Sequence, residues 1–205
     1  MPYSTDDLRD LIIELDKKID RVVSNVETIK DKQEELNKYF STKWKSNLDQ
    51  YQYSGWAIVD KIQSNEQVLD VGCGFNEFKS RILNLVGVDP ANDCADIKLS
   101  IEYFAADNAN HNRFDVALCL GSINFGNEIN ILNQITSVVA CLKPQARIYW
   151  RCNPGLQDHN NEACKKIEFF PWSFQHHLDY SELFGFTCDI LAWDTNNRIY
   201  AEWHR

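Results

Sequence analysis

The chain has 205 residues, of which 44% are hydrophobic and 12% aromatic, and this apolar content excludes global disorder. The net charge is −9 and no run of Lys or Arg stands out, so there is no strong signal for nucleic-acid binding. No stretch reaches the roughly 20 apolar residues of a membrane span, and the acidic N-terminus is unlike a signal peptide, so we expect no membrane association and a cytoplasmic location.

The first forty residues carry a heptad repeat of apolar side chains. From Leu8 to Phe40 the spacing alternates between four and three residues without a break, and Gln33 is the single polar residue in the seam. A helix that lies on its own domain usually shows a wider apolar stripe, so this narrow one favours pairing with copies of itself. We therefore predict a coiled-coil oligomerisation helix over residues 1–40, in a trimer or a dimer, with packing on its own domain or on another protein as the alternatives.

Residues 41–54 are expected to be a polar linker, and residues 55–205 an α/β domain. After a short helix at 55–62, strand-like runs alternate with helical ones. The strand-like runs are 67–71, 84–89, 95–99, 114–120, 146–152, 187–194 and 198–203, and the helical runs are 76–82, 128–142 and 179–186. This alternation predicts a doubly wound, mainly parallel sheet with helices on both faces, to which the hairpin of the last two runs adds an antiparallel strand.

The segment VLDVGCG at 68–74 places two glycines where the first strand ends. Ligands of doubly wound sheets bind at this edge, and Gly72 and Gly74 let the backbone turn tightly and approach a ligand closely. Asp89 ends the second strand, where a carboxylate can accept hydrogen bonds from ribose hydroxyls. Two classes of ligand use this geometry, namely NAD(P) and S-adenosylmethionine.

Three details favour S-adenosylmethionine over a dinucleotide. The dinucleotide fingerprint requires a third glycine, and Glu77 stands in its place. A negative residue there is poorly suited to hold a pyrophosphate. Asp70 precedes the first glycine by two residues, and a carboxylate suits the ammonium group of S-adenosylmethionine, which has no phosphate.

The D-x-G-x-G pattern resembles the glycine-rich motif of the class I S-adenosylmethionine-dependent methyltransferases. VGVDP is similar to the family's ribose-binding acid, FDVALCLGSINF to its fourth-strand motif, LKPQARIYWR to its passage into the fifth strand, and 188–203 to its sixth and seventh strands. The resemblance covers about 67–205. It implies a Rossmann-like seven-stranded sheet in the order 3-2-1-4-5-7-6, with strand seven antiparallel, and S-adenosylmethionine as cofactor.

The resemblance also implies a role for particular residues. Around the methionyl group it places Asp70, Gly72 and Gly74, and on the ribose it places Asp89. Ser100 and Ile101 would lie beside adenine, and Leu120 and Gly121 would offer backbone atoms to the methionyl ammonium. Two departures stand out. The family's usual third glycine is Asn76 here, and the stretch between Asp89 and residue 95 is too short for a full helix.

The catalytic residues are less well marked. Asp158 and His159 follow the fifth strand, and His176 and His177 follow FFPW, so each is a candidate general base. For each of them the alternative is an ordinary polar loop residue. FFPWSF and Trp150 fit an aromatic acceptor pocket, although core packing is the favoured interpretation. The seven cysteines form no C-x-x-C pair, so reduced thiols are expected and no metal site is predicted.

Two functions remain open at this stage. The first is transfer of a methyl group from S-adenosylmethionine to an unidentified oxygen or nitrogen nucleophile. The second is an oligomeric structural or scaffold protein that keeps the fold with little or no activity. NPG and PWSF after the fifth strand make the chain similar to methyltransferases predicted in tailed bacteriophages, which would place it in a host cytoplasm or as a structural protein in a virion.

Overall fold

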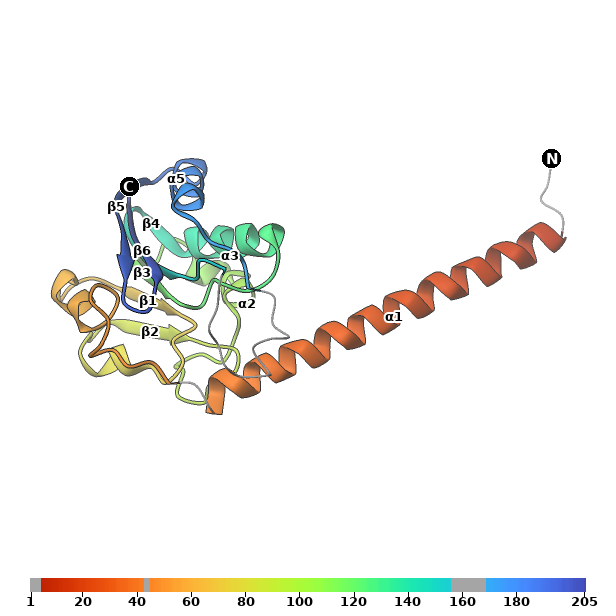
Figure 1. Cartoon of the computed structure of the whole chain (residues 1–205), viewed down its shortest axis with the longest axis horizontal. Helices are drawn as coiled ribbons and strands as arrows, with labels where there is room; N and C mark the ends of the chain where they lie inside the picture. The colour runs from red at the N-terminus through yellow and green to blue at the C-terminus, as the bar shows by residue number, and fades with distance from the viewer. Residues whose placement is uncertain (1–4, 43–44, 156–168) are drawn as a thin grey trace.

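The computed structural model describes residues 5–42, 45–155 and 169–205, and shows a long N-terminal helix followed by an α/β domain (Figure 1). The helices are α1 (Thr5–Thr42), α2 (Ile101–Ala105), α3 (Glu128–Cys141) and α5 (Phe174–Leu183), with 3-10 turns η1 (Trp56–Lys61), η2 (Glu77–Ser80) and η3 (Asn108–Asn110). The strands are β1 (Val68–Val71), β2 (Leu85–Val88), β3 (Phe114–Leu120), β4 (Leu142–Cys152), β5 (Thr187–Asp194) and β6 (Arg198–His204).

The strands form one mixed sheet in the order β2-β1-β3-β4-β6-β5. The first four are parallel, and β6 runs antiparallel to both of its neighbours. The predicted turn of the terminal hairpin is present, since Asn196 and Asn197 adopt the left-handed conformation that a tight hairpin turn requires. The mainly parallel sheet with one antiparallel strand from the terminal hairpin is therefore as the sequence predicts.

The described residues contain six strands, whereas seven were predicted. The missing one is the run at 95–99, which is reduced to a single parallel bridge between Val88 and Ile97. Asp89 accepts hydrogen bonds from the backbone N–H groups of Ala91 and Asn92, and this tight turn brings the chain straight back to the sheet edge. The chain leaves that edge again at Ser100, which caps α2, so no room remains for a longer ladder.

Two short helices that the sequence predicts are 3-10 turns instead. The run at 55–62 forms η1 and the run at 76–82 forms η2. In contrast, α3 has the predicted extent, and α5 begins earlier than predicted because the Ser173 side chain caps it and bonds reciprocally with His176.

Each face of the sheet has its own core of buried side chains, and Figure 1 shows the elements that cover the two faces. Helices α2, α3 and α5 cover one face, where Leu69 and Ala117 point. The 3-10 turns η1 and η2, with the segment at 45–54, cover the other face, where Val68 and Val116 point. Strand β1 is buried over its whole length, as a central strand covered on both faces should be. This arrangement leaves the carboxyl-terminal edge of the parallel strands open.

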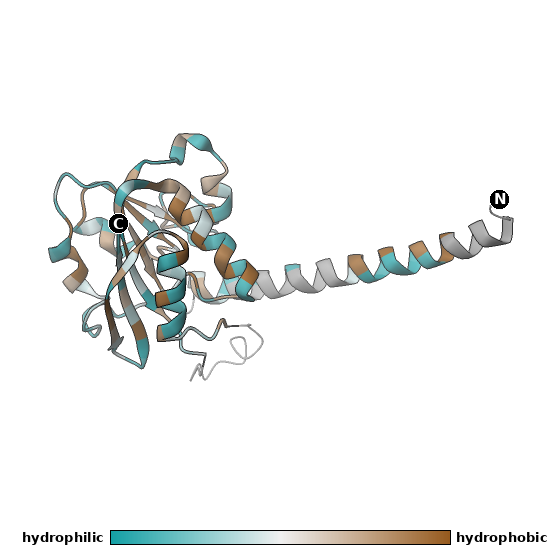
Figure 2. Cartoon of the chain, turned by 90° about the horizontal axis from the view of Figure 1, so that it is seen from above, coloured by the Kyte–Doolittle hydropathy of each residue, from teal (hydrophilic) through white to brown (hydrophobic). Residues whose placement is uncertain are grey.

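Helix α1 projects from the domain, and its apolar side chains recur along the part that Figure 2 colours by hydropathy. Its last turn does not project, because Tyr39 is buried and the ring of Phe40 contacts that of Phe125. Phe40 therefore faces the domain, whereas the heptad pattern assigned it to the seam. No helix within the described residues is both long and apolar enough to cross a membrane.

The predicted linker also packs on the domain. Leu48 and Ser54 are buried, and the backbone N–H groups of Gln52, Tyr53 and Ser54 donate to the carboxylate of Asp194. Burial alone would raise the pKa of Asp194, but these bonds hold it below its ordinary value. The division of the chain at 1–40, 41–54 and 55–205 stays a prediction, but its middle segment is part of the packed structure from residue 45 on.

Candidate functional site

A cavity of about 1020 Å³ opens at the carboxyl ends of the parallel strands. All eight residues that the sequence analysis assigns to a cofactor line it, namely Asp70, Gly72, Gly74, Asp89, Ser100, Ile101, Leu120 and Gly121. They come from the ends of β1, β2 and β3 and from the start of α2. The parallel topology thus brings together residues that are far apart in the sequence. We call the part of the cavity around Asp70 and Asp89 the acidic end.

The turn after β1 requires glycine for two separate reasons. Gly72 has a φ of +64°, and a Cβ there would lie 2.3 Å from the Cβ of Ser122. Gly74 has a φ of +54° with nothing within 4 Å of the position of its absent Cβ, so that side of the cavity stays open. Asn76, which departs from the family pattern, has a φ of 54°, so it adopts the conformation for which glycine is usually chosen.

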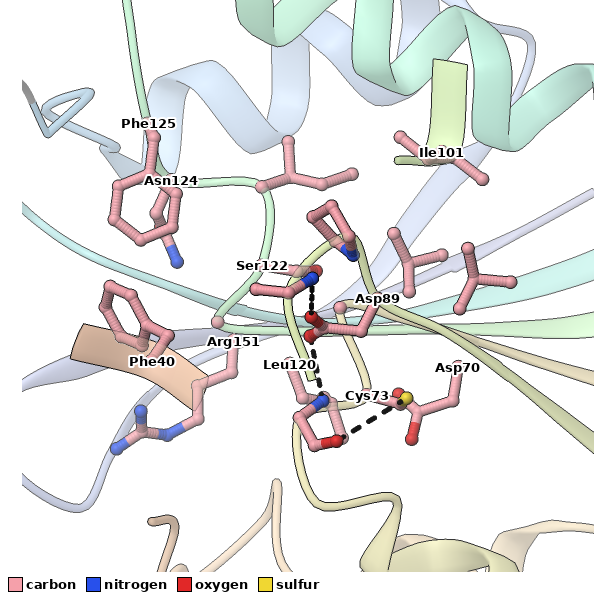
Figure 3. A pocket seen from close by; sticks show the side chains of 18 of the residues that line it. Phe40, Asp70, Cys73, Asp89, Ile101, Leu120, Ser122, Asn124, Phe125 and Arg151 are labelled. Carbon is pink, nitrogen blue, oxygen red and sulfur yellow. Dashed lines mark hydrogen bonds between the residues drawn. The ribbon is translucent and has the colours of Figure 1, made fainter. Parts of the chain in front are cut away.

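Asp89 closes the turn from the neighbouring strand (Figure 3). Its Oδ2 accepts the backbone N–H of Gly74 at 3.0 Å, and its Oδ1 accepts those of Ala91 and Asn92 at 2.8 and 2.9 Å. These bonds fix the orientation of the carboxylate. A carboxylate has about four acceptor sites, so this one can still accept a hydroxyl.

Asp70 is the least usual group at the acidic end. Its side chain comes from the buried strand β1 and is only 4% exposed, and its carboxylate accepts no hydrogen bond from the described residues. Burial, together with the charges of Asp89 and Asp96, raises the pKa of Asp70 to about 7. A buried carboxylate without a partner is costly, and a cation beside it would relieve that cost.

The remaining predicted residues shape the acidic end. Ser100 caps α2, with its hydroxyl accepting the N–H of Tyr103 at 3.5 Å, and Ile101 is buried at the cavity wall. Gly121 follows β3 with a φ of +106° and nothing within 4 Å of the position of a Cβ. The backbone at Leu120 and Gly121 is therefore reachable from the cavity.

The cavity continues to a second part that the sequence analysis did not identify. We call this part the aromatic end, and its residues are Phe40, Asn124, Phe125, Arg151 and Phe169. Figure 3 shows Phe40 and Phe125 on the side of the cavity opposite Asp70 and Asp89. The sequence could have indicated one of these residues. Arg151 is a charged residue in an apolar strand, and the same feature marked Asp70 as a candidate.

The structure separates the candidate catalytic residues. Asp158 and His159 lie outside the described residues, so their role stays a prediction. His177 does not line the cavity but is buried among Trp150, Trp172 and Trp203, and burial lowers its pKa to about 3. His176 bonds with Ser173 at the start of α5. Trp150 and Trp172 belong to the core, as favoured from the sequence.

The cysteines that the structure describes are all free thiols. Cys119, Cys141 and Cys152 are buried, whereas Cys94 is exposed. Cys73 lines the cavity, and burial raises its pKa, so its thiol stays protonated.

Comparisons with known proteins bear on the fold. No protein-family model matches the sequence, and no curated protein matches it either. Among solved structures, the chain is similar to 1,6-didemethyltoxoflavin-N1-methyltransferase of Burkholderia thailandensis, solved with 1,6-didemethyltoxoflavin and S-adenosylhomocysteine, at 15% identity and a TM-score of 0.57 over 73% of this chain and 75% of that one.

Two further structures are similar over most of their length. An S-adenosylmethionine-dependent methyltransferase from Archaeoglobus fulgidus matches at 12% identity and a TM-score of 0.58, over 73% of this chain and 90% of that one. Another from Mesorhizobium loti matches at 11% identity and a TM-score of 0.56, over 78% of this chain and all 100% of that one. At such identities the likeness establishes the fold. The chain therefore has the Rossmann-like fold of the S-adenosylmethionine-dependent methyltransferases.

Proposed function

We propose that the chain is a methyltransferase that binds S-adenosylmethionine at the acidic end of its cavity and transfers the methyl group to an oxygen or nitrogen nucleophile. The observation that carries this proposal is the buried, unpartnered carboxylate of Asp70, which lines the cavity beside the glycine turn. When bound, S-adenosylmethionine supplies a methyl group activated by a sulfonium centre. It also carries an ammonium group, which is the kind of partner that Asp70 lacks.

The other residues of the acidic end fit the same ligand. Asp89 has about one acceptor site left for a ribose hydroxyl, and Ile101 offers an apolar wall to adenine. The open backbone at Gly121 leaves room for the methionine part. A dinucleotide fits less well, because its pyrophosphate would lie near two carboxylates.

Methyl transfer asks little of the protein beyond position. The lone pair of the acceptor forms a bond to the methyl carbon while the carbon–sulfur bond breaks and its electrons stay on sulfur. Holding both molecules in line supplies much of the rate enhancement. The cavity supports such a role, because its acidic and aromatic ends are continuous.

A transfer assay with methyl-labelled S-adenosylmethionine tests this proposal. The intact protein is incubated with separate pools of small metabolites, peptides and nucleic acids, and the label in each pool is counted. We expect label in one pool with the native protein and at most a few per cent of that with Asp70→Asn. Equal labelling by the native protein and the variant would count against the proposed site.

We also propose that α1 holds several copies of the chain together, in a trimer or a dimer. The exposed fractions of Ile12, Ile19 and Val22 are 58, 57 and 60%, and these side chains share the heptad stripe. Burying one such side chain stabilises by about 1.5–3 kcal/mol. Outside the stripe, Glu14 and Lys18 form an ion pair on the polar surface of the helix. Occurrence in a virion, implied by the resemblance to phage methyltransferases, stays a prediction.

The mass of the intact protein by light scattering tests the assembly. We expect two or three chains per particle, and a monomer for the variant with Ile19→Asp and Val22→Asp, because both charges would enter the seam. Lys17→Asp changes the net charge by the same amount on the outer side of the helix, so it should leave the mass unchanged. A native monomer at tens of micromolar would contradict the proposal.

A further inference from the structure

The cavity as a whole is large for a single ligand. Ligand sites usually measure about 300–1,000 Å³, and the whole cavity, at about 1020 Å³, lies at the top of that range. A cofactor at the acidic end would therefore leave the aromatic end free for the methyl acceptor. The chemistry of the side chains there indicates which class of acceptor fits.

Three rings give this end its apolar walls. The ring centroids of Phe40 and Phe125 are 5.4 Å apart with an angle of 61°, and those of Phe125 and Phe169 are 5.1 Å apart with an angle of 49°. Phe40 comes from the last turn of α1, and Phe125 and Phe169 form an isolated antiparallel bridge. Tilted rings of this kind favour contact with a flat, apolar body.

Asn124 presents a hydrogen-bond donor to this space. Its Oδ1 accepts the backbone N–H of Asn153 at 2.9 Å, and this bond fixes which end of the amide faces the protein. The amide nitrogen consequently points into the cavity (Figure 3). Asn124 is buried, so its two N–H donors need an acceptor from whatever occupies the site.

Arg151 adds a buried positive charge. The residue is 7% exposed, burial lowers the pKa of its guanidinium, and this group lies 4.1 Å from the centre of the Tyr51 ring. Its Nη2 donates to the backbone oxygen of Thr195 at 3.2 Å, whereas Nη1 makes no hydrogen bond with the described residues. The guanidinium thus keeps unused donors at the cavity.

Asp194 forms an ion pair with this charge but does not take up its hydrogen-bond donors. Its Oδ2 lies 3.6 Å from the Nε of Arg151, which has no hydrogen-bond partner in the described structure. The Asp194 carboxylate instead accepts from the Ser54 hydroxyl and from the backbone of Gln52, Tyr53, Ser54 and Thr195. Those bonds occupy the carboxylate oxygens, so the ion pair leaves Nη1 of Arg151 without a hydrogen-bond acceptor among the described residues, and Nη1 can donate to a bound anion.

We infer that the aromatic end selects a flat acceptor that carries an anionic oxygen group, namely an aromatic carboxylate. This inference rests on the proposed function and names its acceptor class. Arg151 and Asn124 offer only donors and a positive charge, which match a carboxylate and repel an amine. Arg151 binds the carboxylate and so orients the ring of the acceptor against the contacting rings of Phe40 and Phe125.

Titrations of the intact protein with flat probes test the inference. S-adenosylhomocysteine is added first, and its own binding is measured. The saturated protein is then titrated with 2-naphthoate, 2-naphthamide and 2-naphthylmethylamine, which share one ring system and differ in charge. We expect 2-naphthoate to bind at least tenfold more tightly than the amide, and the amine to bind more weakly still.

Variants test whether Arg151 is responsible for the preference for the carboxylate. Arg151→Gln should abolish the tenfold preference for the carboxylate, and Arg151→Lys should restore part of it. Arg147→Gln, on the same strand but outside the cavity, should leave the preference intact. If loss of the Asp194 contact prevents Arg151→Gln from folding, Phe125→Ala decides instead, and it should weaken all three probes about tenfold.

The possible failures can be told apart. If S-adenosylhomocysteine does not bind to the native protein, the proposed function fails and the inference fails with it. If S-adenosylhomocysteine binds but the amide or the amine binds as well as the carboxylate, the inference alone is overturned. Unchanged binding of 2-naphthoate in both Arg151→Gln and Phe125→Ala would also overturn it.

Discussion

The two ends of the cavity are built in different ways. The acidic end consists of strand ends and the turns that follow them, held by backbone hydrogen bonds such as the one from Gly74 to Asp89. The aromatic end consists of side chains from α1, from the loop after β3, from β4 and from the residues just before α5. The first therefore depends on the sheet itself, whereas the second depends on how distant segments pack. We expect substitutions at one end to leave binding at the other largely unchanged.

The largest expected effect is that of Asp70→Asn on cofactor binding. The variant removes the charge that pairs with the ammonium group, and losing one partner of a buried charge pair costs about 3 kcal/mol. By equilibrium dialysis with labelled S-adenosylmethionine, we expect affinity to fall about 150-fold at pH 7.5. Asp115→Asn is the matched control, because Asp115 pairs with Lys143 outside the cavity, and its affinity should be native.

Weaker binding by Asp70→Asn could also come from a less stable fold, and the pH dependence of the free energy of unfolding argues against that explanation. Folded Asp70 keeps its proton up to about pH 7, whereas the unfolded chain loses it near 3.8. The contribution of this group to the free energy of unfolding is therefore full below pH 4 and is lost as the pH rises to 7. The Asp70→Asn variant has no ionisable group at this position and does not lose stability in this way, so at pH 8 its free energy of unfolding should be at least that of the native protein. A markedly lower free energy of unfolding for the variant at pH 8 would mean that loss of folding contributes to its weaker binding.

Gly72→Ala should have the next largest effect, this time on folding. The positive φ costs 1–2 kcal/mol for a residue with a Cβ, and the new atom would also meet Ser122, so we expect a loss of about 2 kcal/mol in urea unfolding. Gly74→Ala has a similar φ but open space, so about 1 kcal/mol is expected. Adding Ser122→Gly to Gly72→Ala should recover the difference. Equal losses for both alanines would mean that the contact with Ser122 is unimportant.

The pH dependence of cofactor affinity should be smaller. A cationic ligand prefers ionised Asp70, whose pKa is raised to about 7, so affinity should fall about tenfold between pH 7.5 and pH 6. Isothermal titration at several pH values measures this fall. The control ligand is 5′-methylthioadenosine, which lacks both the ammonium and the sulfonium, and its affinity should not decrease over the same range. A flat profile for S-adenosylmethionine would place its charge away from Asp70.

The smallest effect is expected from Phe125→Ala on S-adenosylhomocysteine. Phe125 belongs to the aromatic end, so the affinity measured by titration should stay within about twofold of native, since sites without shared contacts act independently. A tenfold loss would show that the two ends are not separate. The cavity would then act as a single site in which aromatic packing also shapes the acidic end.

The sequence predicted the acidic end because its signals are local. Asp70, Gly72 and Gly74 lie in one short run, and Asp89 ends the next strand, so a parallel sheet has to bring them together. The third strand was predicted wrongly for a reason that is also local. Hydrogen bonds from Ala91 and Asn92 to Asp89 shorten the turn, and the residue pattern did not predict these bonds.

The aromatic end was not predictable in the same way. Phe40 satisfies the heptad spacing, and only its contact with Phe125 reveals that it belongs to the domain. Arg151 did carry a signal, namely a charge in a buried strand, but the glycine that follows it, Gly155, belongs to no D-x-G-x-G pattern that would suggest a ligand. Tertiary packing decided both positions, and it is the part of the structure that spacing and composition describe least well.

Calorimetric titration of the intact protein with S-adenosylmethionine at pH 7.5 tests the central claim most directly. We predict saturable binding of one ligand per chain, with the heat lost in Asp70→Asn. No binding by the folded native protein at millimolar ligand would contradict the account. The chain would then keep the fold of the methyltransferases without their cofactor, as a scaffold protein would.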